Sequence, residues 1–428
     1  MQDGTIEDGD NMCRVLMLLE NNSYPGDPRV RREAISLIDA GFQVTVISPG
    51  KRSMLRYENV DGVHVYHFLM PPPGNSLWGY VWEYGWSTFA SFFLTLWVFF
   101  RRGFDVIHAH NPPDLFVLIA LCYRVLGKKF VFDHHDLSPE MYYARFPNGG
   151  NRIVFRVLVF FEKLSCRFAH QVIATNESYK KVEIERSGIP ATKVTIVRNG
   201  PDLNRVKPVA PDPELRQRAS TILGFIGLMG RQDGVDYFLR ALHYLVNDLN
   251  RNDVLAVIMG TGQMVPELKK LTSGLGLEQY VWFTGRVSDE ELLRYLSTAD
   301  ICFDPDPYNP FNDRSTMIKM LEYMAMAKPI VAFDLTEHRE SAKDAALYSR
   351  RNDVQDFANN IATLIDNPAL REKMGAYGRQ RMEKQLAWHH QEVNLLQVYA
   401  NLGFEAEHKT KPTESNVEPE TVAGANHW

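Results

Sequence analysis

The chain has 428 residues, of which 45% are hydrophobic and 23% charged, a balance typical of a globular protein with two domains. Its formal net charge of −5 excludes a globally basic nucleic-acid-binding protein. The four cysteines are far apart, which argues against a disulfide framework or a Cys-type zinc site and favours the reducing cytoplasm. At the start of the chain, the polar residues 1–11 do not resemble a secretory signal.

The first half of the chain alternates short apolar runs with amphipathic stretches, which is typical of a parallel α/β sheet. We expect its strands at residues 14–20, 44–47, 105–109, 129–133, 171–175 and 194–197. Between the first two strands, Asp27 is placed to cap a helix, Pro28 suits its first turn, and Gly41 ends it. Because a strand–helix–strand unit implies parallel pairing, residues 12–205 are predicted to form a doubly wound, Rossmann-like domain.

The alternation restarts after a linker at residues 201–213 that contains four prolines. We expect strands at residues 222–226, 254–259, 281–284, 301–304 and 330–333, with Ser288 and Glu291 forming a capping box on one helix. Residues 214–385 are therefore predicted to form a second Rossmann-like domain that faces the first across a cleft. We expect a helix at 386–401 to cross back to the first domain and the polar tail 402–428 to be disordered.

Polar residues that directly follow strands are the first candidates for a site, because ligands bind at the carboxyl ends of parallel strands. In the first domain these are Gly26, Asp27 and Arg29 at a helix start, Asn111, and the pair His135 and Asp136. A histidine in this place can hydrogen-bond a sugar or polarise a leaving group. Two solvated imidazoles are the structural alternative. A zinc site that joins His135 to the strand residues His108 and His110 is disfavoured, because no known ligand spacing is present.

In the second domain, glycines follow the first two predicted strands. Gly230 and Gly260 permit a close approach of the backbone, and Arg231 is a candidate for pairing with a phosphate, although a solvated turn arginine is equally compatible with the sequence.

A long loop, residues 304–314, precedes a helix whose N-terminal end suits an anion. We expect Ser315 to cap this helix, with Thr316 beside it. Lys319 and Glu322 lie about one turn apart, as either a surface ion pair or a cation and a carboxylate that accepts two ribose hydroxyls. The Asp-Pro-Asp at 304–306 is also compatible with a metal–diphosphate site, but Asp-x-Asp is common by chance.

Taken in order, these segments resemble retaining glycosyltransferases of family 4, which have the GT-B fold of two Rossmann-like domains. The resemblance covers about residues 12–400 and is carried by residues 26–34, 105–111, 131–136, 227–234, 260–262, 283–286 and 319–329. It implies that His135 is the active-site histidine, that Glu322 binds the nucleotide ribose and that Arg231 lies near the phosphates. It also implies retention of configuration and chemistry without a metal or other cofactor.

The sequence departs from the family pattern at two positions. The first glutamate of the family's glutamate pair falls at Arg314, and the usual phosphate-binding lysine is replaced by Asp233, a charge that Lys319 is expected to restore. Relatives with Lys-x-x-Glu-Tyr-Met-Ala build exopolysaccharide or O-antigen sugars. The predicted function is therefore transfer of a hexosyl unit from a nucleotide sugar, with UDP-sugars favoured, to a glycan or lipid-linked acceptor. The alternatives are a nucleotide-sugar epimerase or hydrolase and a non-catalytic subunit that binds a sugar nucleotide.

Residues 78–100 contain 11 aromatic residues, seven of which share helical spacing: Trp78, Trp82, Trp86, Phe89, Phe93, Trp97 and Phe100. A membrane span is disfavoured, because it would put strands of one sheet on opposite sides of the bilayer and because Glu83 limits the uncharged run to 17 residues. A core helix under the sheet and a monotopic helix in the membrane interface remain as interpretations. We favour peripheral contact with the cytoplasmic face of a membrane, beside a lipid-linked acceptor.

Overall fold

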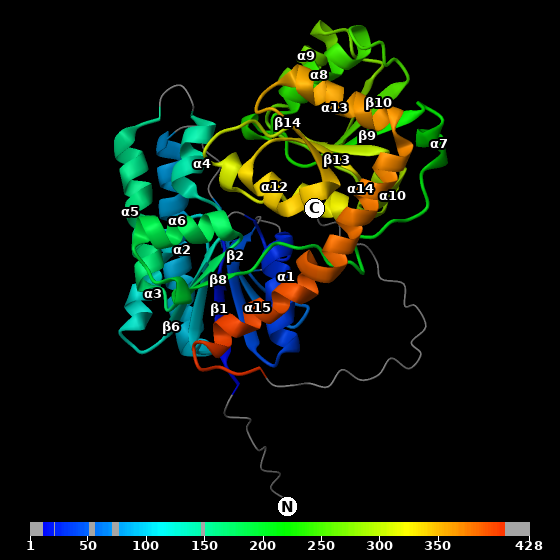
Figure 1. The fold of residues 1–428 in the computed structure, drawn as a ribbon. Coiled ribbons are helices and arrows are strands. Elements are labelled where there is room, and N and C mark those ends of the chain that lie inside the picture. Colours follow the sequence, from blue (N-terminus) through cyan, green and yellow to red (C-terminus); the bar gives the residue numbers. More distant parts are fainter. Residues whose placement is uncertain (1–11, 21, 51–55, 71–76, 147–149, 407–428) are drawn as a thin grey trace, which may run out of the picture.

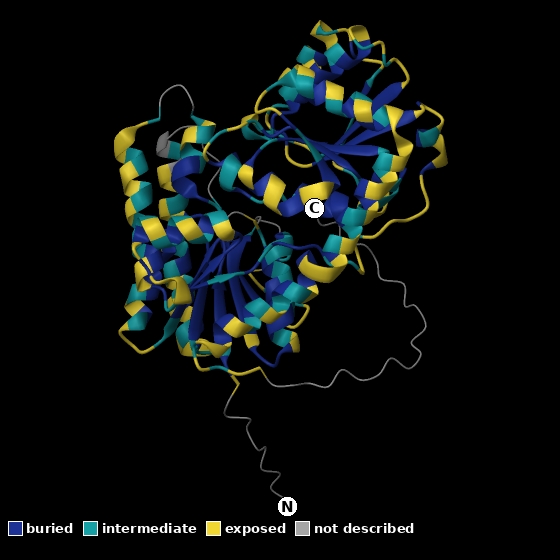
Figure 2. Cartoon of the chain, in the orientation of Figure 1, coloured by how far each residue is buried: buried dark blue, intermediate teal, exposed yellow. Residues whose placement is uncertain are grey.

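The computed structural model describes residues 12–20, 22–50, 56–70, 77–146 and 150–406, apart from the side chains of residues 77, 78 and 80. Within these ranges the chain forms two α/β domains, each with a central sheet covered by helices on both faces (Figure 1). The central strands of both sheets are buried, and the solvent-exposed residues lie mainly on the helices and loops around them (Figure 2). The predicted fold class, two doubly wound Rossmann-like domains, is confirmed.

The N-terminal sheet has eight strands in the order β3-β4-β2-β1-β5-β6-β7-β8. In chain order they are β1 (Arg14–Leu18), β2 (Gln43–Gly50), β3 (Tyr57–Val60), β4 (Val63–Leu69), β5 (Val106–His110), β6 (Lys129–His134), β7 (Gln171–Ala174) and β8 (Val194–Ile196). All neighbouring pairs are parallel except β3 and β4, which form a hairpin. The order of strands reverses at β1, between β2 and β5, where doubly wound sheets place their ligands.

Six helices accompany this sheet: α1 (Pro28–Asp39), α2 (Leu77–Arg101), α3 (Phe116–Arg124), α4 (Ser138–Arg145), α5 (Arg152–Phe168) and α6 (Glu177–Ser187). Asp27 caps α1 by accepting a hydrogen bond from the Arg29 amide (3.0 Å), as predicted. A short 3-10 turn, η1 (Ala191–Lys193), precedes β8. The helices α2, α3 and α5 cover one face of the sheet, and α1 covers the other.

The C-terminal sheet has six parallel strands in the order β11-β10-β9-β12-β13-β14. They are β9 (Thr221–Ile226), β10 (Val254–Met259), β11 (Val281–Gly285), β12 (Ile301–Asp304), β13 (Ile330–Phe333) and β14 (Ala346–Ser349). The helices are α7 (Pro213–Arg216), α8 (Val235–Asn247), α9 (Val265–Gly274), α10 (Asp289–Thr298), α11 (Ile318–Ala325), α12 (Thr336–Ala342), α13 (Val354–Asp366) and α14 (Pro368–Arg381), with 3-10 turns η2 (Arg231–Asp233), η3 (Asn312–Arg314) and η4 (Lys343–Ala345). The predicted capping box of Ser288 and Glu291 is present on α10.

The end of the described chain returns to the N-terminal domain. After a π-helical turn, η5 (Met382–Leu386), helix α15 (Trp388–Ala400) packs against α1. Trp388 donates a hydrogen bond to the Ser36 hydroxyl (3.0 Å), and Tyr399 lies in the same apolar core as α1. The tail that we expect to be disordered lies, from residue 407 onward, outside the described residues.

Candidate active site

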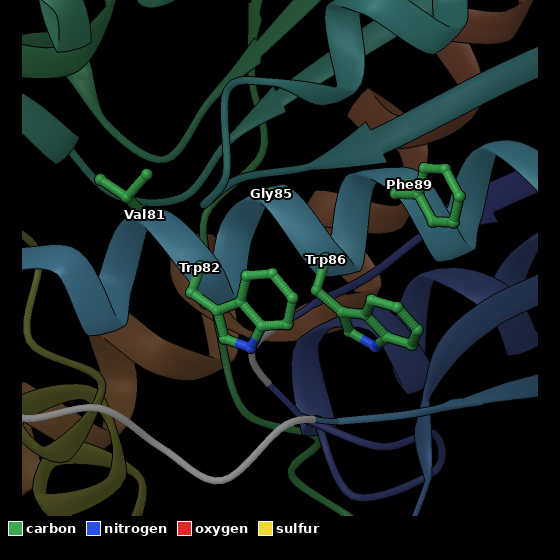
Figure 3. A pocket seen from close by; sticks show the side chains of 5 residues that line it. All are labelled: Val81, Trp82, Gly85, Trp86 and Phe89. Atoms are coloured by element: carbon green, nitrogen blue, oxygen red, sulfur yellow. The ribbon is translucent and has the colours of Figure 1, made fainter.

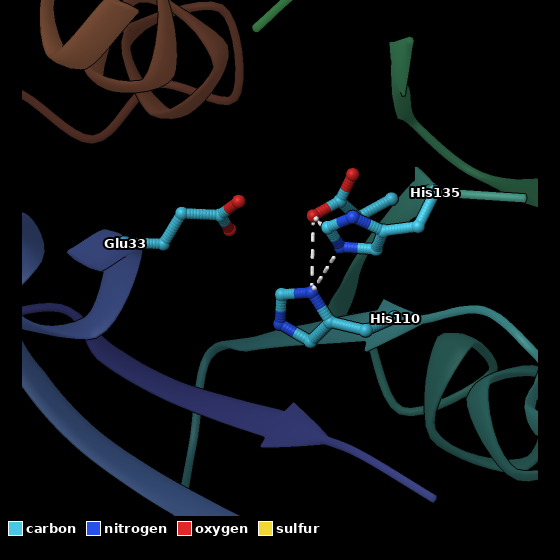
Figure 4. A group of neighbouring side chains, drawn as sticks. Glu33, His110 and His135 are labelled. Atoms are coloured by element: carbon cyan, nitrogen blue, oxygen red, sulfur yellow. Dashed lines mark hydrogen bonds and ion pairs between the residues drawn. The ribbon is translucent and has the colours of Figure 1, made fainter. Parts of the chain in front are cut away.

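A cluster of buried polar side chains lies at the carboxyl edge of the N-terminal sheet, where β5 and β6 end beside α1 (Figure 4). His110 and Asp133 are register partners on these two strands, and His135 follows β6. The Asp133 Oδ2 atom lies 2.8 Å from His135 Nε2 and 3.0 Å from His110 Nδ1, and the two histidine nitrogens are 3.0 Å apart. His135 is therefore buried and held by one nitrogen, whereas its Nδ1 has no hydrogen-bond partner among the described residues.

Burial sets the charge state of this cluster. Burial and the adjacent Asp133 carboxylate raise the pKa of Glu33, a residue of α1, well above its ordinary value. Burial opposes the ionisation of Asp133, but the imidazoles of His135, His108 and His110 hold the pKa of Asp133 well below its ordinary value. Burial, with a smaller effect of His110, lowers the pKa of His108 to about 4. Burial therefore favours the neutral form of Glu33, whereas Asp133 is held as the carboxylate that orients the imidazole of His135.

The other predicted residues of the first domain surround this cluster. Arg29 and Asp27 form a bidentate ion pair at the start of α1, with Nη2 to Oδ2 at 2.8 Å and Nε to Oδ1 at 3.1 Å. Asn111 clamps the turn after β6, because its Nδ2 donates to the Asp136 carbonyl (2.7 Å) and its Oδ1 accepts from the Asp136 amide (3.1 Å). Asn111 thus holds the turn that carries His135. Gly26 closes the preceding loop by donating to a carbonyl oxygen (2.7 Å).

On the second domain, a glycine-lined turn follows β9 and leads into η2. A Cβ atom at Gly260 would lie 2.0 Å from the Gly227 carbonyl oxygen, and the φ of Gly260 is +131°, so only glycine fits there. Gly230 donates its amide to Asp233 Oδ2 (2.9 Å). Arg231 is exposed and has no hydrogen bond or ion pair with the described residues, and η2 contacts α4 of the other domain. Arg231 is therefore an available cation at the junction of the domains.

Lys319 does not pair with Glu322. Its Nζ lies 2.6 Å from Asp306 Oδ1 and 3.1 Å from Asp304 Oδ1, where the loop leaves β12. Burial opposes the charge of Lys319, but Asp304 and Asp306 raise its pKa. Burial, followed by the charge of Asp304, raises the pKa of Asp306 to about 7. The surface ion pair of Lys319 with Glu322 that the sequence allows is therefore not formed, because the lysine is bound to the Asp-Pro-Asp segment instead.

Glu322 is buried on α11, where burial raises its pKa to about 7 against the opposing charge of Arg32. Arg32 comes from α1 of the other domain, and its guanidinium lies 5.4 Å from the centroid of the Trp388 ring. Its Nε and Nη2 atoms are buried and have no hydrogen-bond partner among the described residues. Sequence reasoning missed Arg32, because only its position in the fold distinguishes it from the neighbouring arginines of α1.

The segment between η3 and α11 joins the two domains. Asn176, after β7, donates Nδ2 to the Arg314 carbonyl (2.9 Å) and to the Thr316 hydroxyl (3.1 Å). Arg314 pairs with Glu140 of α4, with Nη1 to Oε1 at 3.3 Å. The prediction that Ser315 caps the helix is wrong: α11 begins at Ile318 after Met317, because the chain first forms η3 and the Ser315 hydroxyl bonds to the Phe311 carbonyl (2.8 Å).

Two groups of side chains have the residue types and spacing of metal ligands. Ligand atoms of Glu33, His110, Asp133 and His135 all lie within 4.8 Å of one another, and those of Asp304, Asp306 and His338 do so too. In the second group the Lys319 ammonium already lies between the two aspartates. The first group could accept a cation, but without one its contacts are those of a hydrogen-bonded histidine cluster around Asp133.

Comparison with known proteins assigns the family. A model described as glycosyl transferases group 1 matches residues 220–367, and a model described as glycosyltransferase family 4 matches residues 29–205. The chain is a GT4-type glycosyltransferase. An uncharacterized glycosyltransferase of Methanocaldococcus jannaschii is 26% identical to this glycosyltransferase over 320 residues, which cover 70% of this chain and 73% of the relative.

Solved structures with the GT-B fold superpose on both domains of the glycosyltransferase. Sucrose-phosphate synthase from Thermosynechococcus elongatus gives a TM-score of 0.74 at 17% identity, covering 91% of this chain and 99% of that one. Anabaena HepE in complex with UDP and glucose gives a TM-score of 0.68 at 19% identity, with the same coverage. The α/β GT-B fold that the resemblance implied is therefore confirmed, with the candidate residues of both domains at the carboxyl edges of the two sheets.

Proposed function

We propose that the glycosyltransferase transfers a hexosyl unit from a nucleoside-diphosphate sugar, with UDP-sugars favoured, to a glycan or lipid-linked acceptor with retention of configuration. The observation that carries this proposal is the geometry of His135. Its imidazole is buried, with Nε2 held by Asp133 and with Nδ1 unpaired among the described residues. A preoriented nitrogen of this kind suits a hydrogen bond to a donor-sugar hydroxyl. The UDP complex of Anabaena HepE, which shares the fold, supports the choice of nucleotide.

The C-terminal domain binds the nucleotide-sugar donor in this proposal. The buried Glu322 binds the ribose hydroxyls, and the exposed Arg231 binds the diphosphate beside the glycine turn. In the same proposal, Gly230, Gly260, Ser315 and Thr316 contact the bound donor. Lys319 acts on the donor indirectly, because it holds the segment that follows β12.

In the reaction, the bond between the anomeric carbon and the diphosphate oxygen breaks, and Arg231 stabilises the negative charge that develops on the leaving group. The acceptor hydroxyl then bonds to the anomeric carbon from the same face and passes its proton to a phosphate oxygen. On the acceptor side of the site, the loops are held in place by the Asp27–Arg29 pair and by Asn111. Asp136 lies in the turn that Asn111 holds. None of these steps requires a metal ion, and membrane contact through residues 78–100 would present a lipid-linked acceptor on the cytoplasmic face.

The test is product analysis with a panel of UDP-, GDP- and ADP-sugars, with the anomeric configuration of the product determined by NMR. We expect a glycoside that retains the donor's configuration. Release of free sugar with every acceptor would indicate a hydrolase, a changed sugar without transfer would indicate an epimerase, and inversion would refute the proposed same-face route.

A further inference from the structure

Helix α2 turns its predicted aromatic stripe outward and has small hydroxyl residues at the centre of its buried face. Its fully buried residues are Ser87, Ser91, Thr95 and Val98. The aromatic side chains instead face outward: Trp82, Phe89, Phe93, Trp97 and Phe100 are 61%, 57%, 53%, 59% and 80% exposed. The Ser91 and Thr95 hydroxyls are buried with no hydrogen-bond partner among the described residues. Helix α2 does pack on the N-terminal core, through Ala90, Phe92, Leu94, Val98 and Phe99. The core-helix interpretation of residues 78–100 is therefore wrong for the described residues of the predicted stripe, which lie on the uncovered face.

This uncovered face continues onto neighbouring helices. Helix α3 contacts both α2 and α5, and all three lie on one side of the N-terminal sheet (Figure 1). On α5, the side chains of Ile153, Val157 and Phe160 are 69%, 47% and 57% exposed. Val125 and Leu126, directly after α3, are 84% and 58% exposed. We call the outward surface of α2, α3 and α5, including these two residues, the apolar platform.

The charges of these helices are almost all basic, although the whole chain has a net charge of −5. The exposed or half-buried basic residues are Arg101, Arg124, Arg152, Arg156, Lys163 and Arg167. Glu83 is the acidic residue of these helices that is not neutralised by an ion pair among the described residues, because Glu162 is buried and paired with Arg186. An apolar centre with aromatic residues and basic neighbours matches the interface of an anionic bilayer. A second copy of the same basic surface would be repelled.

An open apolar groove lies on the platform, at the N-terminal half of α2. Gly85 forms its floor, since a Cβ atom there would meet nothing within 4 Å, and Val81, Trp82, Trp86 and Phe89 line its sides (Figure 3). The rings of Trp82 and Trp86 lie side by side with centroids 6.2 Å apart. Trp86 also donates its indole N–H to the Leu69 carbonyl (2.7 Å), which fixes the wall of the groove to the end of β4.

The groove lies near the carboxyl edge of the N-terminal sheet, because Trp86 is bonded to the Leu69 carbonyl at the end of β4. The hydroxyl of Ser87, on the buried side of the same turn, lies 3.4 Å from the carboxylate of Glu20, which follows β1 at the carboxyl edge of the sheet. Within the part of the chain that the structure describes, no helix is both long and apolar enough to cross a bilayer. The platform can therefore rest on a membrane and deliver a lipid headgroup to the cleft without inserting a helix through it.

We propose that the apolar platform docks on an anionic lipid bilayer, with the Gly85 groove receiving a hydrocarbon chain. Docking itself does not depend on the proposed transfer reaction, but the delivery of an acceptor through the groove rests on it. The aromatic face supplies interfacial affinity and the arginines supply selectivity for anionic lipids.

Vesicle flotation of the full chain tests docking directly. We expect wild type to float with phosphatidylcholine vesicles that contain phosphatidylglycerol, and to bind much less to phosphatidylcholine alone. Arg152→Glu/Arg156→Glu should weaken binding to the anionic vesicles by about tenfold or more, since each basic residue near the membrane surface contributes about fivefold to the affinity. The matched control, Lys269→Glu/Lys270→Glu on exposed positions of α9, should bind like wild type.

The aromatic contribution is tested with Trp82→Ser/Phe93→Ser, for which Val393→Ser, an exposed apolar position on α15, is the control. Far-UV circular dichroism and UDP binding confirm that each variant is folded. Absence of wild-type binding to anionic vesicles would overturn the proposal, as would a dimer in solution that the Trp82→Ser/Phe93→Ser variant dissociates, because the face would then be an interface between copies.

The two proposals fail separately in these experiments. Transfer to a short water-soluble acceptor, measured without vesicles, reports on the proposed function alone, and the platform variants should retain it. Transferase activity without vesicle binding would refute the platform only, whereas vesicle binding without activity on any acceptor would refute the proposed function only. Gly85→Leu, which fills the groove, should lower transfer to a lipid-linked acceptor while leaving vesicle binding and the water-soluble reaction unchanged.

Discussion

Replacing Lys319 with methionine tests whether this lysine holds the segment after β12 or is free to bind phosphate. The substitution keeps most of the apolar stem but removes the ammonium that lies 2.6 Å from Asp306 and 3.1 Å from Asp304. At an effective dielectric constant of about 20, each contact is worth roughly 5–6 kcal/mol of attraction, most of which offsets desolvation. Two buried carboxylates without their cation should cost about 3–5 kcal/mol of folding free energy.

The loss should depend on pH in a definite direction. The pKa of Asp306 is already raised to about 7, and removal of Lys319 raises it further. A carboxyl group that binds a proton more tightly in the folded state contributes less stability as the pH rises through its folded pKa. The cost of Lys319→Met should therefore be larger at about pH 8 than at about pH 5.5, and adding Asp306→Asn should recover part of it.

Native-state hydrogen exchange of the β12 and β13 amides measures this loss within the C-terminal domain. Lys328→Met is the matched control, because the Lys328 ammonium donates to two neutral carbonyls, at 2.7 Å each, and has no carboxylate to leave unpaired. Its cost should be smaller and independent of pH. A loss of less than about 1 kcal/mol for Lys319→Met, equal at both pH values, would refute the structural role.

Four further predictions concern the site. His135→Ala should lower turnover by about a hundredfold or more while UDP affinity, measured by calorimetry, stays nearly the same; unchanged turnover would remove His135 from the active site. Glu322→Ala should weaken UDP binding by up to about 3 kcal/mol for each ribose hydrogen bond lost, and Glu340→Ala, at an exposed position on α12, should not. Burial raises the pKa of Glu322 to about 7, so the stability of the nucleotide-free protein should fall as the pH rises toward 7, by up to about 3 kcal/mol, and Glu322→Gln should flatten that fall. Incubation with a chelator should leave activity intact, and its loss would implicate the Glu33, His110, Asp133 and His135 group as a metal site.

The sequence predicted the strands that consist of continuous apolar runs, because both faces of a parallel sheet are buried. It missed β3, β4 and β14. The β3–β4 hairpin turns at Asp61 and Gly62, both with positive φ, and an Asp-Gly pair between two β-type segments is the signal that could have revealed it. Strand β14 has only four residues, and it forms a strand because it pairs with β13.

The histidine cluster was partly predictable, since His108 and His110 alternate on one strand and His135 follows the next. The ion pairs were not. Arg314 meets Glu140 across 174 positions of sequence, and Arg32 faces Glu322 from another domain. Local sequence patterns cannot predict these contacts, because they form only when the two domains pack against each other.

The return of α15 to the N-terminal domain has a consequence for how the chain is made. The core around β1 and α1 includes Trp388, Leu395, Val398 and Tyr399, and the Tyr399 hydroxyl lies 2.9 Å from His108 Nδ1, behind the histidine cluster. On the ribosome, the first domain emerges long before this helix does. The candidate site at the edge of its sheet therefore stays incomplete until the last described helix has been synthesised, so a chain truncated before Trp388 lacks the contact of Tyr399 with His108.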